Sequence, residues 1–196
     1  QHRWPLDERA GHEFRDRLAS LLSRSGSPLA RALARAYETP WPSVPIRVDI
    51  AAYAGPVAAY TMLDPTHITI ASGDRRHIGD AALEILFHEA SHSLVRRIEE
   101  SIARACRAQG KQVPSTLWHE VLFYSTGELT RRQLGSSYTP YAYQNGLYER
   151  NPEWKAVEPL LVRYWLAYLD GRQSLDATID QLVAGDAVPA TIATVH

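Results

Sequence analysis

Residues 87–92 read Phe87-His88-Glu89-Ala90-Ser91-His92, an instance of the pattern H-E-x-x-H. On a helix, residues four apart point the same way, so the imidazoles of His88 and His92 project side by side. Two imidazoles placed in this way can bind one zinc ion from a single rigid element. Glu89 then lies beside the metal, where it can take a proton from bound water. The pattern therefore predicts a helix with a metal site on one side.

The sequence around this stretch predicts one long helix. Apolar residues recur at helical spacing from Leu83 to Ile102, and Asp80 is suited to cap the start. Gly110 is a stop signal at the other end. The two histidines fall beside the apolar stripe, so they flank the core. The alternative interpretation is a pair of partly buried histidines in a structural helix, which leaves the glutamate unexplained.

Composition limits the class of protein. The 196 residues suit one domain, 45% of them are hydrophobic, and 21 basic residues nearly balance 22 acidic ones. This balance gives no electrostatic reason to expect nucleic acid or an anionic membrane as a partner. No apolar run approaches the roughly 18 residues that a membrane helix needs. The single cysteine, Cys106, excludes an internal disulfide and a cysteine-rich zinc site, and we expect it in the core.

The compartment can be inferred only from the start of the chain. The sequence begins at Gln1, and its single methionine is Met62. We expect that a secretory signal has been removed and that the protein is periplasmic or secreted. Nothing in the sequence indicates the oligomeric state.

The order of the predicted elements indicates a single, mostly helical α+β domain over residues 1–196. Residues 1–38 read as an N-terminal helical segment, followed by a proline-rich linker. Residues 46–134 carry the predicted strands and the metal-site helices, and 135–196 a tyrosine-rich loop and C-terminal helices. We expect a small sheet to pack on the H-E-x-x-H helix.

Turn signals divide these segments further. The N-terminal segment is expected to break at 25–28, where Gly and Pro interrupt the helical pattern. In the C-terminal part, Asn151 is suited to cap a helix that bends near Pro159. Short strands are predicted at 46–50, 57–61 and 67–72.

A second buried helix is predicted at 115–134, because this stretch is apolar almost all round. His119 and Glu120 lie in it, and a buried imidazole or carboxylate needs a partner, for which a metal is suitable. His77, in the loop before the first helix, is a further residue that can lie near the site.

Three short strands, an H-E-x-x-H helix and a second buried helix with a further possible ligand resemble the zincin metallopeptidases. The resemblance covers roughly residues 46–130 and implies a zincin-like α+β fold. It implies that His88 and His92 are zinc ligands and that Glu89 is the general base. In that family an edge strand of the sheet holds the substrate in extended form. The metzincin subgroup is excluded, because Val95 and Ile98 stand where it has glycine and a third histidine.

The third ligand is either His119 or Glu120. The segment 117–121 is similar to the downstream helix of gluzincins, where a glutamate is the ligand, but it has His and Val where that subgroup has Asn and Gly. Neutral imidazole binds zinc well, and three histidines favour a strongly acidified water, so His119 is the preferred assignment. Glu128 is a possible partner for a ligand histidine, or a solvated carboxylate.

The resemblance predicts a zinc-dependent hydrolase, a metallopeptidase that cleaves a peptide or amide bond of a peptide or protein substrate. A tetrahedral oxyanion needs a donor besides zinc, and several zincins use Tyr or His. Tyr143 is the candidate, with Tyr138, Tyr141 and Tyr148 behind it, and packing is the competing role for each. Two other classes stay open: a catalytically silent zincin-like domain that binds metal or peptide, and a metal-free helical scaffold.

Overall fold

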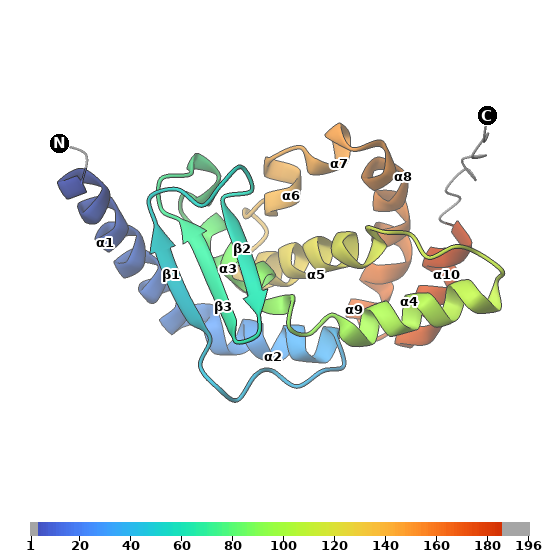
Figure 1. Ribbon diagram of the computed structural model, residues 1–196. Coiled ribbons are helices and arrows are strands. Elements are labelled where there is room, and N and C mark those ends of the chain that lie inside the picture. Colours follow the sequence, from blue (N-terminus) through green and yellow to red (C-terminus); the bar gives the residue numbers. More distant parts are fainter. Residues whose placement is uncertain (1–3, 186–196) are drawn as a thin grey trace. The chain divides into compact units, whose positions relative to one another are not determined.

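The structure of the protein, a computed structural model, describes residues 4–185 and has an α+β fold with a small three-stranded sheet (Figure 1). The chain forms two compact units. The first comprises the described residues up to Arg97 together with Leu122–Gly146. The second comprises Ile98–Val121 and the described residues from Leu147 on. Among the described residues, no helix is both long and apolar enough to cross a membrane.

The sheet of the first unit consists of β1 (Arg47–Ala51), β2 (Ala59–Leu63) and β3 (Thr66–Ala71). Its strand order is β1-β3-β2, in which β1 runs parallel and β2 antiparallel to β3. The three predicted strands are confirmed, with bounds shifted by one or two residues. Because β2 pairs with β3 alone within the described chain, it is an edge strand.

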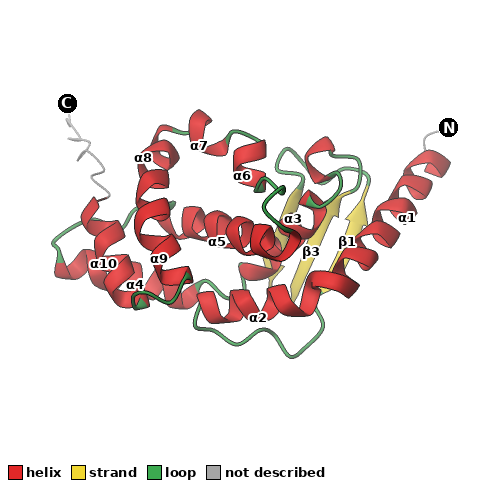
Figure 2. Ribbon diagram, turned by 180° about the vertical axis from the view of Figure 1, so that it is seen from behind, coloured by secondary structure: helices red, strands yellow, loops and turns green. Residues whose placement is uncertain are grey.

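One face of this sheet packs on helix α3 (Ala81–Ser91), and within the described part of the first unit no helix covers the other, open face (Figures 1 and 2). Ile68 and Ile70 of β3 are 1% and 0% exposed, because alternate side chains of a strand point to the same face. Tyr60 and Met62 of β2 are 43% and 51% exposed on the opposite face. The expected packing of the sheet on the H-E-x-x-H helix is thus confirmed.

The N-terminal segment is helical without a loop. Helix α1 (Trp4–Leu21) continues through a π-helical turn, Leu22–Gly26, into α2 (Ser27–Ala36). The break expected at 25–28 is wrong, because Pro28 falls in the first turn of α2, where a missing N–H costs no helical hydrogen bond. The buried residues of this segment include Phe14, Leu18, Leu21, Leu29 and Leu33.

The H-E-x-x-H helix is shorter than the sequence predicts. Helix α3 ends at Ser91, and a separate helix, α4, spans Arg96–Ala108. Between them the N–H of Leu94 donates to the carbonyl of Ser91 at 2.9 Å, a bond between residues three apart. The hydroxyl of Ser93 donates to the carbonyl of Ala90 at 2.7 Å and so competes for a helical acceptor. The expectation of one helix to about residue 109 is therefore wrong.

The second predicted helix is confirmed as α5 (Leu117–Leu134), which is followed in the first unit by the short helix α6 (Tyr141–Gln144). The boundary between the units falls inside α5, after Val121, so one continuous helix belongs to both. Gly127 of α5 is buried, and a Cβ there would lie 2.7 Å from Pro140 Cβ and 3.2 Å from Glu84 Oε1. This glycine lets α5 approach α3 and the segment before α6.

The second unit contains α7 (Leu147–Arg150), α8 (Pro152–Leu160), α9 (Leu166–Leu169) and α10 (Leu175–Gly185). The predicted cap is confirmed, because the Asn151 side chain accepts from the N–H of Glu153 at 3.0 Å. A π-helical turn, Leu161–Trp165, follows Pro159 and accounts for the irregularity expected there. Trp165 is completely buried in this unit.

Gly127→Ala should destabilise the protein by about 1–3 kcal/mol, because the added methyl overpacks the contact with Pro140 and Glu84. Gly11→Ala is the matched control, since an added Cβ in α1 would meet nothing within 4 Å. It should be neutral or slightly stabilising. Urea unfolding of both variants measures the difference. Equal stability of the two variants would contradict the close approach at Gly127.

Candidate metal centre

Three histidines predicted as ligands lie together. His88 is on α3, His92 follows its last residue, and His119 is in the first turn of α5. Each offers one ring nitrogen, and these nitrogens lie within 4.8 Å of one another. A tetrahedral ion with metal–nitrogen bonds of about 2.0–2.1 Å has donor atoms about 3.4 Å apart, so the three rings would have to draw closer together around a bound ion. The described residues therefore include a group of three imidazoles that can hold a metal ion.

Aromatic rings lie beside the imidazoles of His88 and His119. The ring of His88, which is 2% exposed, lies 3.8 Å from that of Phe123 and 5.1 Å from that of His92, centroid to centroid. The ring of His119 lies 5.0 Å from Trp118 and 5.8 Å from Trp154. Burial lowers the pKa of His92, and the neutral imidazole that this favours is the form that binds a metal.

Glu89 is a buried carboxyl next to this group. Its Oε2 lies 3.9 Å from Nε2 of His92, and the hydroxyl of Thr61 on β2 donates to the same oxygen at 2.8 Å. Burial raises the pKa of Glu89 to about 7, although the hydrogen bond from Thr61 lowers it. A carboxyl with a pKa near neutrality can both take and give a proton near neutral pH, as acid–base catalysis requires.

Glu120, the alternative third ligand, is not a member of the histidine group within the described chain. Its side chain is 1% exposed, and its Oε1 accepts a hydrogen bond from the hydroxyl of Thr116 at 2.8 Å. Thr116 stands one turn earlier in the sequence, just before α5 begins. His119, the preferred residue, is thus a member of the histidine group, whereas the Oε1 of Glu120 pairs with Thr116. Which of the two binds a metal stays a prediction.

The four tyrosines of the predicted loop have different positions. Tyr143, the candidate oxyanion donor, is on α6 with 36% of its surface exposed. Tyr141 is buried, and its ring lies 6.2 Å from that of Phe123 with the planes 18° apart. Tyr148 lies in the second unit, 5.9 Å from Trp154. The catalytic role of Tyr143 stays a prediction, and Tyr141 lies next to Phe123, whose ring lies against His88.

Other residues considered from the sequence have structural partners. Nδ1 of His77 lies 3.0 Å from the carbonyl oxygen of Ala71, in a turn before α3. Glu128 accepts hydrogen bonds from Arg131 at 2.8 Å and Arg132 at 2.7 Å. Burial alone would raise the pKa of Glu128, but these two arginines hold that pKa below its ordinary value. Cys106 is buried in α4, as expected.

Glu84 is a buried carboxyl that sequence reasoning missed. It lies one turn before His88, is completely buried, and its Oε2 accepts from the hydroxyl of Tyr138 at 2.8 Å and the N–H of Tyr141 at 2.9 Å. Its Oε1 has no hydrogen-bond partner among residues 4–185. Burial raises the pKa of Glu84 to about 7, although both bonds lower it. In the sequence, the signal that could have found Glu84 is its place as a single acidic residue within an apolar helical run.

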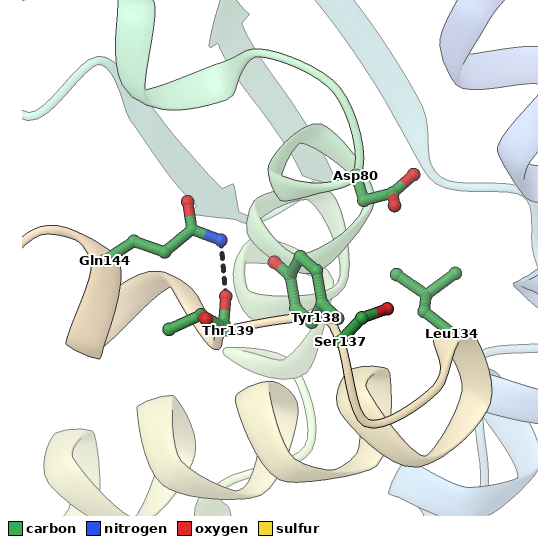
Figure 3. A pocket seen from close by; sticks show the side chains of 6 residues that line it. All are labelled: Asp80, Leu134, Ser137, Tyr138, Thr139 and Gln144. Carbon is green, nitrogen blue, oxygen red and sulfur yellow. Dashed lines mark hydrogen bonds between the residues drawn. The ribbon is translucent and has the colours of Figure 1, made fainter.

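Tyr138 also lines an open pocket of about 580 Å³ on the first unit (Figure 3). The amide of Gln144 donates to the carbonyl of Thr139 at its wall. None of the three metal-site histidines belongs to this pocket. The lining residues are Asp80, Leu134, Ser137, Tyr138, Thr139 and Gln144.

Comparisons with protein-family models, with curated proteins and with solved structures find no match to this chain. The interpretation of the site therefore depends on its own chemistry. That chemistry is three imidazole nitrogens within reach of one ion and a carboxyl with a raised pKa beside them.

Glu84→Gln tests the buried carboxyl through the pH dependence of stability. Burial raises the pKa of Glu84 from 4.5 to about 7, so folding takes up a proton between these values and stability falls as pH rises through them. The full effect corresponds to roughly 3 kcal/mol. Because glutamine resembles the neutral acid, the free energy of unfolding of the variant should increase relative to wild type from about pH 5 to about pH 8.

Urea unfolding of both proteins at several pH values measures this difference. Glu89 also has a raised pKa, but it is present in both proteins, so its effect on the pH dependence of stability cancels in the difference between them. A difference between variant and wild type that stays constant across the range would contradict a neutral, buried Glu84.

Proposed function

We propose that the protein is a zinc-dependent hydrolase of zincin-like type, most simply a metallopeptidase. The observation that carries the proposal is the group of His88, His92 and His119 with the carboxyl of Glu89 3.9 Å from one of its members. Support for the fold comes from three short strands on the H-E-x-x-H helix and a second buried helix that carries the third histidine.

The donor set fits zinc. Three neutral imidazoles leave the full +2 charge on the ion and one tetrahedral position for water, as in hydrolytic zinc sites. Imidazole also suits Co²⁺ and other divalent transition metals, whereas Mg²⁺ and Ca²⁺ prefer oxygen donors. Bound zinc would supply a water acidified to a pKa of about 7 and polarisation of the substrate carbonyl.

Glu89 supplies the acid–base chemistry in this proposal. Its carboxylate takes a proton as the water oxygen attacks the carbonyl carbon, and the acid then gives this proton to the leaving amine nitrogen as the C–N bond breaks. The raised pKa of Glu89 suits both transfers near neutral pH. Tyr143 remains the proposed donor to the oxyanion, and β2 is the edge strand along which an extended peptide would lie.

The burial of the site favours a second candidate, a closed metal site that stabilises the fold without catalysis. His88 is 2% and Glu89 is 6% exposed, as expected for groups that do not meet a substrate. His92 and His119 are only partly buried, however. The two candidates differ in what Glu89 contributes.

Glu89→Gln tests the proposed base. The variant should bind zinc at the wild-type ratio, because Glu89 is not one of the three donors. Hydrolysis should fall by about 10²–10⁴-fold, because glutamine cannot accept the proton. Fluorescently labelled casein is the substrate, and zinc is measured by mass spectrometry on the same samples. Glu99→Gln, an exposed position on α4, is the control.

Wild-type turnover by the Glu89→Gln variant would remove Glu89 from the mechanism. A wild-type protein that binds zinc and cleaves nothing would favour the closed structural site.

A further inference from the structure

Thr61 joins the edge strand β2 to the proposed base. Its hydroxyl oxygen lies 2.8 Å from Oε2 of Glu89 and also 2.8 Å from the main-chain carbonyl oxygen of the same residue. The strand register sets Thr61 opposite Ile68, which is buried between the sheet and α3. The hydroxyl therefore projects from the inner face of the sheet onto the last turn of α3.

The same carboxylate oxygen faces both the strand and the histidine group. Oε2 accepts from Thr61 and lies 3.9 Å from Nε2 of His92. A glutamate side chain has rotatable bonds that a single helix does not fix. Threonine is stiff at its first side-chain dihedral because it is branched at Cβ, so its hydroxyl is a fixed partner. The bond from Thr61 thus selects one position of the Glu89 carboxylate beside the histidines.

A hydroxyl suits a group that changes between carboxylate and carboxylic acid during a reaction. Thr61 has one O–H to donate and lone pairs with which to accept. It can donate to the Glu89 carboxylate, or accept from the acid while it donates to the nearby main-chain carbonyl at 2.8 Å. In both states the two side chains stay paired, so the carboxyl does not have to move when it gains or loses the proton.

We propose that Thr61 is a positioning residue for Glu89, holding its carboxyl group in the orientation that proton transfer requires. The inference rests on the proposed hydrolase function. The side chain of Thr61 acts only through Glu89, and it points to the inner face of the sheet and has no proposed contact with the substrate.

Thr61→Val and Thr61→Ser are the informative variants. Valine keeps the shape of threonine without the hydroxyl, and serine keeps the hydroxyl. Thr69→Val is the matched control, because Thr69 is on β3 of the same sheet but alternates to the open face with its partner Tyr60. Zinc content, kcat and KM on labelled casein are measured for all three and for wild type.

Thr61→Val should retain zinc and KM while kcat falls about ten- to a hundredfold, because the base is no longer held in place. Thr61→Ser should recover most of kcat, and Thr69→Val should match wild type. A kcat for Thr61→Val equal to that of Thr69→Val overturns the proposal, as does a serine variant as slow as valine. Loss of zinc from Thr61→Val would also overturn it, because the role would then be structural.

The contact between Thr61 and Glu89 can also be tested without an activity assay, from the melting temperatures of the metal-free protein. Thr61→Val, Glu89→Ala and the double variant form a cycle, and residues in direct contact give non-additive effects. The fall in melting temperature of the double variant should differ from the sum of the two single falls, whereas Thr69→Val with Glu89→Ala should be additive. Additivity for Thr61 and Glu89 would overturn the pairing.

Different results would overturn the hydrolase function and the positioning role of Thr61. A zinc-loaded wild type that hydrolyses nothing overturns the hydrolase function and the positioning role together. An active wild type beside a fully active Thr61→Val variant overturns the positioning role alone.

Discussion

The close approach of α5 to α3 at Gly127 is the constraint on which the arrangement of the first unit depends. A Cβ at this position would lie 2.7 Å from Pro140, so only glycine allows the helix to lie there without displacement. Four residues earlier on α5, Phe123 lies against His88, and His119 is one further turn away on the same continuous helix. The spacing of the two helices thus places the ring of Phe123 on α5 against the ring of His88 on α3.

Helix α3 holds two buried carboxyls, and each has one hydroxyl partner from another segment. Glu84 accepts from Tyr138, and Glu89 accepts from Thr61. Desolvation raises the pKa of both to about 7, because a carboxylate loses more hydration than one hydroxyl restores. The two groups differ in their surroundings. Glu84 binds the segment before α6 to α3, whereas Glu89 lies beside the histidine group.

Features that depend on local sequence could be predicted. Short strand-forming runs between turn signals predicted the three strands to within two residues, and Asn151 caps α8 as its position before proline indicates. The spacing of His88 and His92 is likewise local, because His92 directly follows α3 and keeps helical backbone angles. The end of α3 was missed, because a single hydroxyl bond from Ser93 to Ala90 competes with the helical pattern that continues on either side.

Features that depend on contacts distant in sequence could not be predicted. Glu84 and Tyr138 are 54 residues apart, and Thr61 and Glu89 are 28 apart, so no local pattern indicates either pair. His119 was preferred over Glu120 on ligand chemistry alone, and the structure adds the position that brings it to the other two histidines. Tyr143 was chosen from a cluster of tyrosines, and such a cluster carries no information on which ring points toward a site.

The most direct test of the metal centre is zinc content by mass spectrometry on purified wild type, His119→Ala and Glu120→Gln after incubation with zinc. We expect about one tightly bound zinc per chain in wild type and Glu120→Gln, and loss of that zinc in His119→Ala. Wild-type protein without zinc, or loss in Glu120→Gln alone, would contradict a centre built from His88, His92 and His119.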